Sequence, residues 1–210
     1  MITLQRCLIY LTIAMTFLVC QRTDSSTYAP EPLPYPATDS VDYTVYSAII
    51  DQYCSNQQAE KQLFIIAPQT VKAYVNDWQN VLKEDRPDSV SANPAWQQFV
   101  STLDSSKFKT QSLNRSIPSA CYRTQTLTDQ QWTYYFKSSA STGIEGLRKD
   151  FPGFSSQISF SSVAYSADGK KAVCYRSSVC GGLCGTGDLY FLERKSMGWR
   201  VASSRLVWIS

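Results

Sequence analysis

Apolar residues recur at helical spacing through the first half of the chain. Val41, Val45, Ile49 and Tyr53 lie four positions apart and follow candidate capping residues at 38–40, which predicts an amphipathic helix over residues 40–57. A continuous apolar run then predicts a short buried strand over residues 63–67. Further periodic patterns predict three more helices, over 71–82, from the Asn93 and Pro94 cap to 103, and after the capping-box pair Thr128 and Gln131.

The second half has the alternation of β-strands from Gln157 onward. Four β-rich runs occupy residues 157–166, 171–179, 188–195 and 199–210, and Asp168 with Gly169 supplies a tight turn between the first two. Such short connections predict an antiparallel meander of about four strands, with the N-terminal helices packed on one face. Because helices and strands are segregated along the chain, the predicted fold class is α+β.

The N-terminus has the pattern of a targeting segment. Arg6 precedes an apolar run from Cys7 to Cys20, which is short for a membrane span but typical of a signal peptide. Three outcomes stay open at its end. The sequence before Cys20 resembles a lipoprotein box, although Val19 stands where Gly, Ala or Ser is preferred; ordinary signal-peptidase cleavage and an uncleaved membrane anchor are the alternatives.

Residues 21–39 are polar and then proline-rich. Prolines at positions 30, 32, 34 and 36 favour an extended spacer over a packed element. This segment is either a stalk that holds a domain away from a membrane or an unstructured remnant of the leader. The predicted organisation is therefore a signal peptide or anchor at 1–20, a linker at 21–39, and a single α+β domain at 40–210, which is long enough to bury one core.

Composition removes several kinds of chemistry. The chain has no histidine, which excludes Ser-His-Asp triads, Cys-His nucleophile pairs and His-ligated zinc. Its net charge of +3 divides into −5 over residues 1–106 and +8 over 107–210. Either the two halves neutralise each other by packing, or the basic half is attracted to an anionic surface such as lipid headgroups or wall polymer. No combined basic and aromatic motif indicates nucleic acid, so we predict no nucleic-acid partner.

The stretch CGGLCGTGD at 180–188 allows four interpretations: a redox pair, a metal site, a phosphate loop or a turn. Gly181 and Gly182 disfavour the helix of a thioredoxin-type motif, whose spacing also differs. Asp188 and a strand follow where a phosphate loop needs Lys, then Ser or Thr, then a helix. No second cysteine pair at metal spacing exists, and we predict neither metal nor cofactor. A turn remains, in which Gly181 and Gly182 reverse the chain and Gly185 and Gly187 lead into the next strand.

Residues 151–210 resemble a group of bacterial envelope proteins that have no assigned activity. The shared features are the CGxLCGxG turn, a following leucine-glutamate strand, a GW-x-V strand and a terminal WIS. The resemblance implies export and this strand order, and it implies no catalytic residue or substrate. It also implies that Cys174 stands at an aliphatic position, as a buried small hydrophobe and not as a disulfide partner.

Five cysteines follow Cys20, so at least one thiol stays free within a monomer in an oxidising compartment. The candidate disulfides are Cys180 with Cys184, which closes a small ring, and Cys54 with Cys121, which closes a long loop.

We therefore predict an exported binding or scaffolding domain of the cell envelope, without enzymatic activity, whose ligand the sequence does not identify. Membrane attachment would be through the N-terminus, by lipid at Cys20 or by an uncleaved anchor. The alternative is a thiol-dependent redox protein or enzyme that uses Cys180 and Cys184.

Overall fold

The computed structural model describes residues 35–52, 54, 62–73, 82 and 88–210, and residues 33–210 form one compact unit. The predicted leader with Cys20, most of the linker and most of the predicted helix at 71–82 lie outside the described residues. Val71, at the start of the predicted helix at 71–82, forms a β-bridge with Ser161 and is not helical. Among the described residues no helix is both long enough and apolar enough to cross a membrane.

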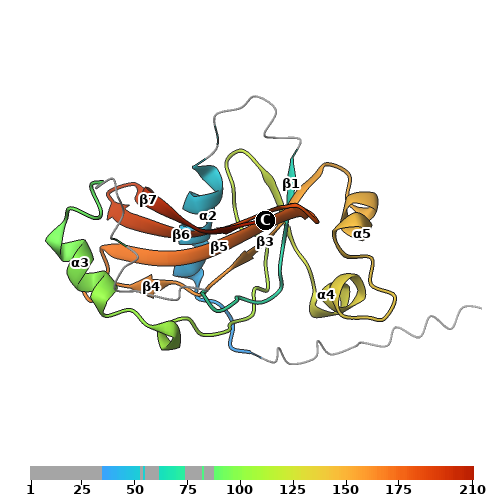
Figure 1. The fold of residues 1–210 in the computed structure, drawn as a ribbon, viewed down its shortest axis with the longest axis horizontal. Coiled ribbons are helices and arrows are strands. Elements are labelled where there is room, and N and C mark those ends of the chain that lie inside the picture. Colours follow the sequence, from blue (N-terminus) through green and yellow to red (C-terminus); the bar gives the residue numbers. More distant parts are fainter. Residues whose placement is uncertain (1–34, 53, 55–61, 74–81, 83–87) are drawn as a thin grey trace, which may run out of the picture. The chain divides into compact units, whose positions relative to one another are not determined.

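The fold is α+β and is built on a seven-stranded mixed sheet (Figure 1). The strand order is β2-β1-β3-β5-β6-β7, and β4 also pairs with β5. The strands are β1 (Leu63–Ile66), β2 (Arg123–Thr126), β3 (Phe154–Phe160), β4 (Ala164–Tyr165), β5 (Lys171–Gly181), β6 (Cys184–Lys195) and β7 (Gly198–Ile209).

The predicted antiparallel meander is confirmed, and it is only part of the sheet. Strands β3, β5, β6 and β7 are antiparallel neighbours. The predicted first strand is divided into β3 and β4, because Ser161 between them interrupts the ladder to β5. Its N–H still donates to the Tyr175 carbonyl of β5, but its own carbonyl accepts from the Tyr46 hydroxyl, and the Tyr175 N–H donates to the Ser161 hydroxyl instead. On the other side of β3, strand β1 pairs in parallel with both β3 and β2, which the sequence did not predict.

Four α-helices and one 3₁₀ turn are described. They are α2 (Ser40–Asp51), α3 (Pro94–Ser101), η2 (Ser105–Lys107), α4 (Asp129–Phe136) and α5 (Gly143–Asp150). Asp39 and Asn93 cap α2 and α3, and Thr128 with Gln131 forms the predicted capping box of α4. Helix α5 was not predicted, since its two glycines disfavour a helix.

Helix α2 ends at Asp51, six residues before the predicted end at 57. The Asp51 carboxylate accepts hydrogen bonds from the Ser119 hydroxyl and the Ala120 N–H, and Cys54 is joined to Cys121 just beyond. The spacing of apolar residues predicted a longer helix because it carries no information about these tertiary contacts.

Helices cover both faces of the sheet, not one. Helix α2 packs through residues such as Tyr46 and Ile49 against Ile158, Cys174 and Tyr190. On the other face α3 packs against one end of the sheet, and α4 with α5 packs against the other end, around β1 (Figure 1). The long strands are apolar at successive positions, such as Val173 and Cys174, because both faces are buried.

Candidate functional site

The structure brings both candidate cysteine pairs to disulfide distance. Cys54 and Cys121 are joined with their Cα atoms 5.6 Å apart, and Cys180 and Cys184 with theirs 5.2 Å apart. Both separations lie within the range that a disulfide requires. The first pair ties the end of α2 to the segment before β2, and the second closes the tip of the β5–β6 hairpin.

The turn at this tip is shorter than predicted. Strand β5 continues to Gly181 and β6 begins at Cys184, so only Gly182 and Leu183 connect them. We predicted that Gly181 and Gly182 reverse the chain because glycine can adopt positive φ, but neither residue has a positive φ. The disulfide and the cross-strand pairing hold the reversal instead.

Gly185 and Gly187 lie within β6 and not in a turn. Glycine is required there because the indole of Trp208 on β7 lies against both residues. A Cβ at Gly187 would stand 2.0 Å from Trp208 Nε1, and one at Gly185 would stand 3.1 Å from Trp208 Cζ3. The Trp208 Nε1–H donates to the Tyr175 hydroxyl at 2.6 Å, which holds the ring in place. Glycines two residues apart share one face of a strand, and this spacing was the signal that the sequence offered.

The hairpin tip is tied to α5 by Arg148. Its Nη2 donates to the Cys180 carbonyl at 2.6 Å, and its Nη1 pairs with Glu145 at the same distance. Cys184 is exposed and Leu183 is 93% exposed. The tip thus presents a disulfide to solvent beside a guanidinium that is already bonded.

Among the described cysteines Cys174 is the one with a free thiol, and it is fully buried, as the resemblance implied. Burial raises the pKa of this thiol far above its usual range, although the hydroxyl of Ser161 lowers it in part. A protonated, inaccessible thiol packed under α2 is a core residue and not a nucleophile.

A wide hollow of about 810 Å³ lies beside α2. Its lining includes residues 197–201, from the β6–β7 turn and the start of β7, and two residues of the 115–118 segment, Arg115 and Pro118. Helix α2 contributes mainly small or polar side chains, namely Ser40, Tyr43, Thr44, Ser47, Ala48, Asp51 and Gln52.

The hollow combines an aromatic ring, a cation and hydroxyl groups. The Arg115 guanidinium lies 4.2 Å from the centre of the Tyr43 ring, close enough for a cation–π interaction. The Tyr43 hydroxyl donates to Asn114 Oδ1 and accepts from the Asn114 N–H, which fixes the ring. Asp51 is bonded to Ser119 and Ala120, so the exposed Arg115 and Arg200 are the charges that the hollow offers. Such a surface can bind an anionic, hydroxyl-bearing ligand.

The first turn of α2 carries a buried carboxyl, that of Asp42, near Trp199 of the hollow. Asp42 is 4% exposed and accepts a hydrogen bond from the Tyr165 hydroxyl at 2.7 Å, and the Tyr165 ring packs against Trp199. Burial, the largest cause, raises the pKa of Asp42 above its usual 3.8, the bond from Tyr165 lowers it in part, and the charge of Asp39 raises it. Burial and the bond to Asp42 raise the pKa of Tyr165 well above 10.

Replacing Asp42 with asparagine is expected to change how stability depends on pH. A carboxyl whose pKa rises on folding binds more protons folded than unfolded, so its ionisation destabilises the protein as pH rises from about 3.8 through the raised folded pKa. Asparagine keeps an oxygen acceptor for Tyr165 and cannot ionise. The free energy of unfolding of Asp42→Asn, relative to wild type, should therefore increase across this window and stay level above it.

Denaturant unfolding at several pH values from 3.5 to 7 measures this change. Asp104→Asn is the control with the opposite sign. Hydrogen bonds from Ser106 lower the pKa of Asp104, so the free energy of unfolding of this variant, relative to wild type, should decrease as the pH rises toward and through 3.8. A relative stability of Asp42→Asn that does not change with pH would contradict the prediction.

No family model, no curated protein and no solved structure matches the chain. The site is therefore described by its geometry alone. Sequence reasoning named as candidates the two cysteine pairs that the structure brings to disulfide distance, but it did not find the hollow, whose lining residues come from three separate segments.

Proposed function

We propose that the chain is an exported, non-enzymatic binding domain of the bacterial cell envelope, held near a membrane by its N-terminus, and that the hollow beside α2 takes the ligand. The observation that carries the proposal is the exposed Arg115 guanidinium held over the Tyr43 ring. Two cysteine pairs at disulfide distance fit an oxidising compartment. The resemblance of residues 151–210 to envelope proteins supports the same location.

The chemistry of the hollow favours an anionic wall polymer that carries hydroxyl groups. Arg115 offers charge-assisted hydrogen bonds to phosphate or carboxylate groups. Ser40 and Thr44 are exposed on the same side of α2, and Trp199 adds an aromatic edge. Aromatic rings and hydroxyl groups suit the apolar faces and the hydroxyls of sugars.

Replacing Arg115 with glutamate is expected to weaken binding to isolated bacterial cell walls about tenfold, because the change reverses the charge of the hollow. Arg123→Glu is the matched control: Arg123 is exposed on β2 and does not line the hollow, so its effect should be less than twofold. Sedimentation with walls that keep their anionic polymers, and with walls stripped of them, measures both variants.

Equal binding by the two variants would refute the hollow as the ligand site. Equal binding of wild type to intact and stripped walls would refute the anionic ligand. Denaturant unfolding of both variants checks that the fold is retained.

The second candidate function is thiol-disulfide exchange at Cys180 and Cys184, which the exposed position of Cys184 favours. Exchange requires an accessible thiolate of low pKa after reduction. Alkylation of the reduced protein as a function of pH distinguishes the two functions: rapid alkylation at neutral pH supports exchange, and ordinary thiol reactivity supports a structural ring.

A further inference from the structure

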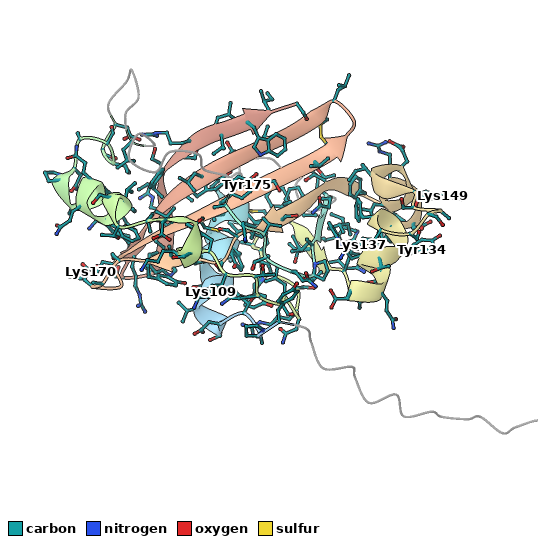
Figure 2. The ribbon with its side chains drawn as sticks, turned by 60° about the horizontal axis from the view of Figure 1, so that its bottom comes forward. Lys109, Tyr134, Lys137, Lys149, Lys170 and Tyr175 are labelled. Atoms are coloured by element: carbon teal, nitrogen blue, oxygen red, sulfur yellow. A yellow bond between two sulfur atoms is a disulfide. The ribbon has the colours of Figure 1, made fainter. Side chains whose placement is uncertain are left out.

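Two neighbouring turns form one end of the sheet, which we call the basic hairpin end. One turn joins β4 to β5 and the other joins β6 to β7. They are adjacent because Lys171 pairs with Glu193, Glu193 pairs with Arg200, and the Arg194 N–H donates to the Lys170 carbonyl at 2.9 Å. The basic hairpin end comprises Lys170, Lys171, Arg194, Lys195, Met197 and Arg200. Figure 2 shows Lys170 at the end of the molecule opposite to Lys137 and Lys149 of the α4–α5 region.

An apolar side chain stands at the apex of this end. Met197 is 99% exposed in the turn between β6 and β7. Two residues later Trp199 is half-buried, with its ring 5.7 Å from that of Tyr165. Exposed apolar side chains beside an interfacial tryptophan are typical of surfaces that enter the boundary between lipid headgroups and acyl chains.

The charge around Met197 is positive. Five cations of the basic hairpin end stand against two carboxylates, Asp168 and Glu193. The carboxylates already have partners: Asp168 accepts from the Ser166 hydroxyl and the Lys170 N–H, and Glu193 pairs with Lys195. Lys170, Arg194 and Arg200 are exposed. These side chains complement the phosphates of an anionic leaflet, which attracts basic residues within a Debye length.

The opposite end of the sheet also has an exposed apolar side chain, but the cation beside it is already bonded. Leu183 is 93% exposed at the β5–β6 tip, and the nearby Arg148 is bonded to Glu145 and to the Cys180 carbonyl. An apolar apex therefore occurs at both ends, but at the β5–β6 tip the adjacent cation is paired with a carboxylate, whereas Lys170, Arg194 and Arg200 of the basic hairpin end are exposed. Because of this difference in charge, we assign the contact to the basic hairpin end and expect its partner to be anionic.

We propose that the basic hairpin end contacts an anionic lipid surface, with Met197 inserted among the headgroups. The contact would be the second link to the membrane besides the N-terminus. It would fix which side of the domain faces the lipid. The proposal rests on the envelope location in the proposed function. Met197 and Arg200 also line the hollow, so Lys170, which does not line it, separates the lipid contact from ligand binding in the hollow.

Amide hydrogen exchange of the full chain with vesicles tests the contact locally. Vesicles of phosphatidylglycerol and phosphatidylcholine are compared with vesicles of phosphatidylcholine alone. The apolar run at 7–20 would bind either kind, so the measured quantity is protection of residues 168–171 and 195–200. We expect this protection with the anionic vesicles, its loss at 1 M salt, and little with the neutral ones.

Two variants and one control sharpen the test. Met197→Asp and Lys170→Glu should each require about tenfold more anionic lipid for half-maximal protection. Lys170 does not line the hollow, so its variant should leave wall binding unchanged. Leu183→Asp, the same kind of change at the opposite apex, should behave as wild type.

Several outcomes would overturn the proposal. Protection of 180–184 in place of the basic hairpin end would place the contact at the wrong end. Equal protection by neutral vesicles, or protection by a soluble polyglycerol phosphate and not by vesicles, would identify another partner. Failure of Arg115→Glu in the wall assay with normal vesicle protection would count against the hollow alone.

Discussion

Replacing Cys54 and Cys121 with serine is expected to lower the free energy of unfolding by about 4 kcal/mol. The two cysteines are 67 positions apart, so their bond removes a large amount of chain entropy from the unfolded state. The bond also holds the end of α2 beside the segment that leads into β2. Denaturant unfolding of the oxidised protein measures the loss, which corresponds to a fall in Tm of roughly 10 °C for a domain of this size.

The second cysteine pair is the matched control for this prediction. Cys180 and Cys184 are four positions apart, and their replacement with serine should cost about 2 kcal/mol or less while the sheet stays intact. A loss at the tip as large as that at Cys54 and Cys121 would contradict both loop-length arguments. Peptide mapping of the non-reduced protein checks the connectivity directly.

Replacing Gly187 with alanine is expected to destabilise the protein by roughly 3 kcal/mol. The new Cβ would stand 2.0 Å from Trp208 Nε1, so the indole must leave its place over β6 and give up its hydrogen bond to Tyr175. Because Gly187 is paired with Ser177 on one side and Trp208 on the other, the backbone of β6 has little freedom to yield. Unfolding by denaturant, followed through tryptophan fluorescence, measures both the stability and the displaced indole.

Gly182→Ala is the control, since a Cβ there would meet no atom within 4 Å. It should change the stability by less than about 0.5 kcal/mol. If Gly187→Ala were as mild as Gly182→Ala, the close approach of Trp208 would not be what requires glycine at this position.

The elements that the sequence predicted well are those whose signals are local. Thr128 and Gln131 form a cap within one turn, and the strand periods from Gln157 onward need only neighbouring residues. The parallel pairing of β1 with β2 and β3 has no such signal, because the apolar run at 63–66 looks the same in any sheet. Helices on both faces were missed for a related reason, because no local pattern says which face of the sheet a given helix covers.

The candidate site divides in the same way. The cysteine pairs were candidates from their number and spacing, which left the connectivity open, and the fold brings both pairs to disulfide distance. The roles of Gly185 and Gly187 depend on Trp208, which lies about twenty positions later on a neighbouring strand. The hollow depends on Arg115 and Tyr43, which the fold alone brings together. Features formed by residues close in sequence can be predicted from the sequence, whereas contacts across the sheet depend on the topology of the fold.

The central position of β1 has a consequence for how the chain is made. Its partner Arg123 lies 60 positions later and its other partner Phe154 lies 91 positions later. Ribosomes add about 5–20 residues per second, so the apolar segment LFII emerges roughly 5–20 s before β3 is complete. Until β2 follows, roughly 3–12 s later at this rate, the backbone groups of β1 have no partner strand, and one edge stays unpaired until β3 is complete, so the segment is exposed to mispairing with other chains. If the chain crosses a membrane unfolded, as the proposed function requires, this interval is longer and the apolar segment at 63–66 stays unpaired longer.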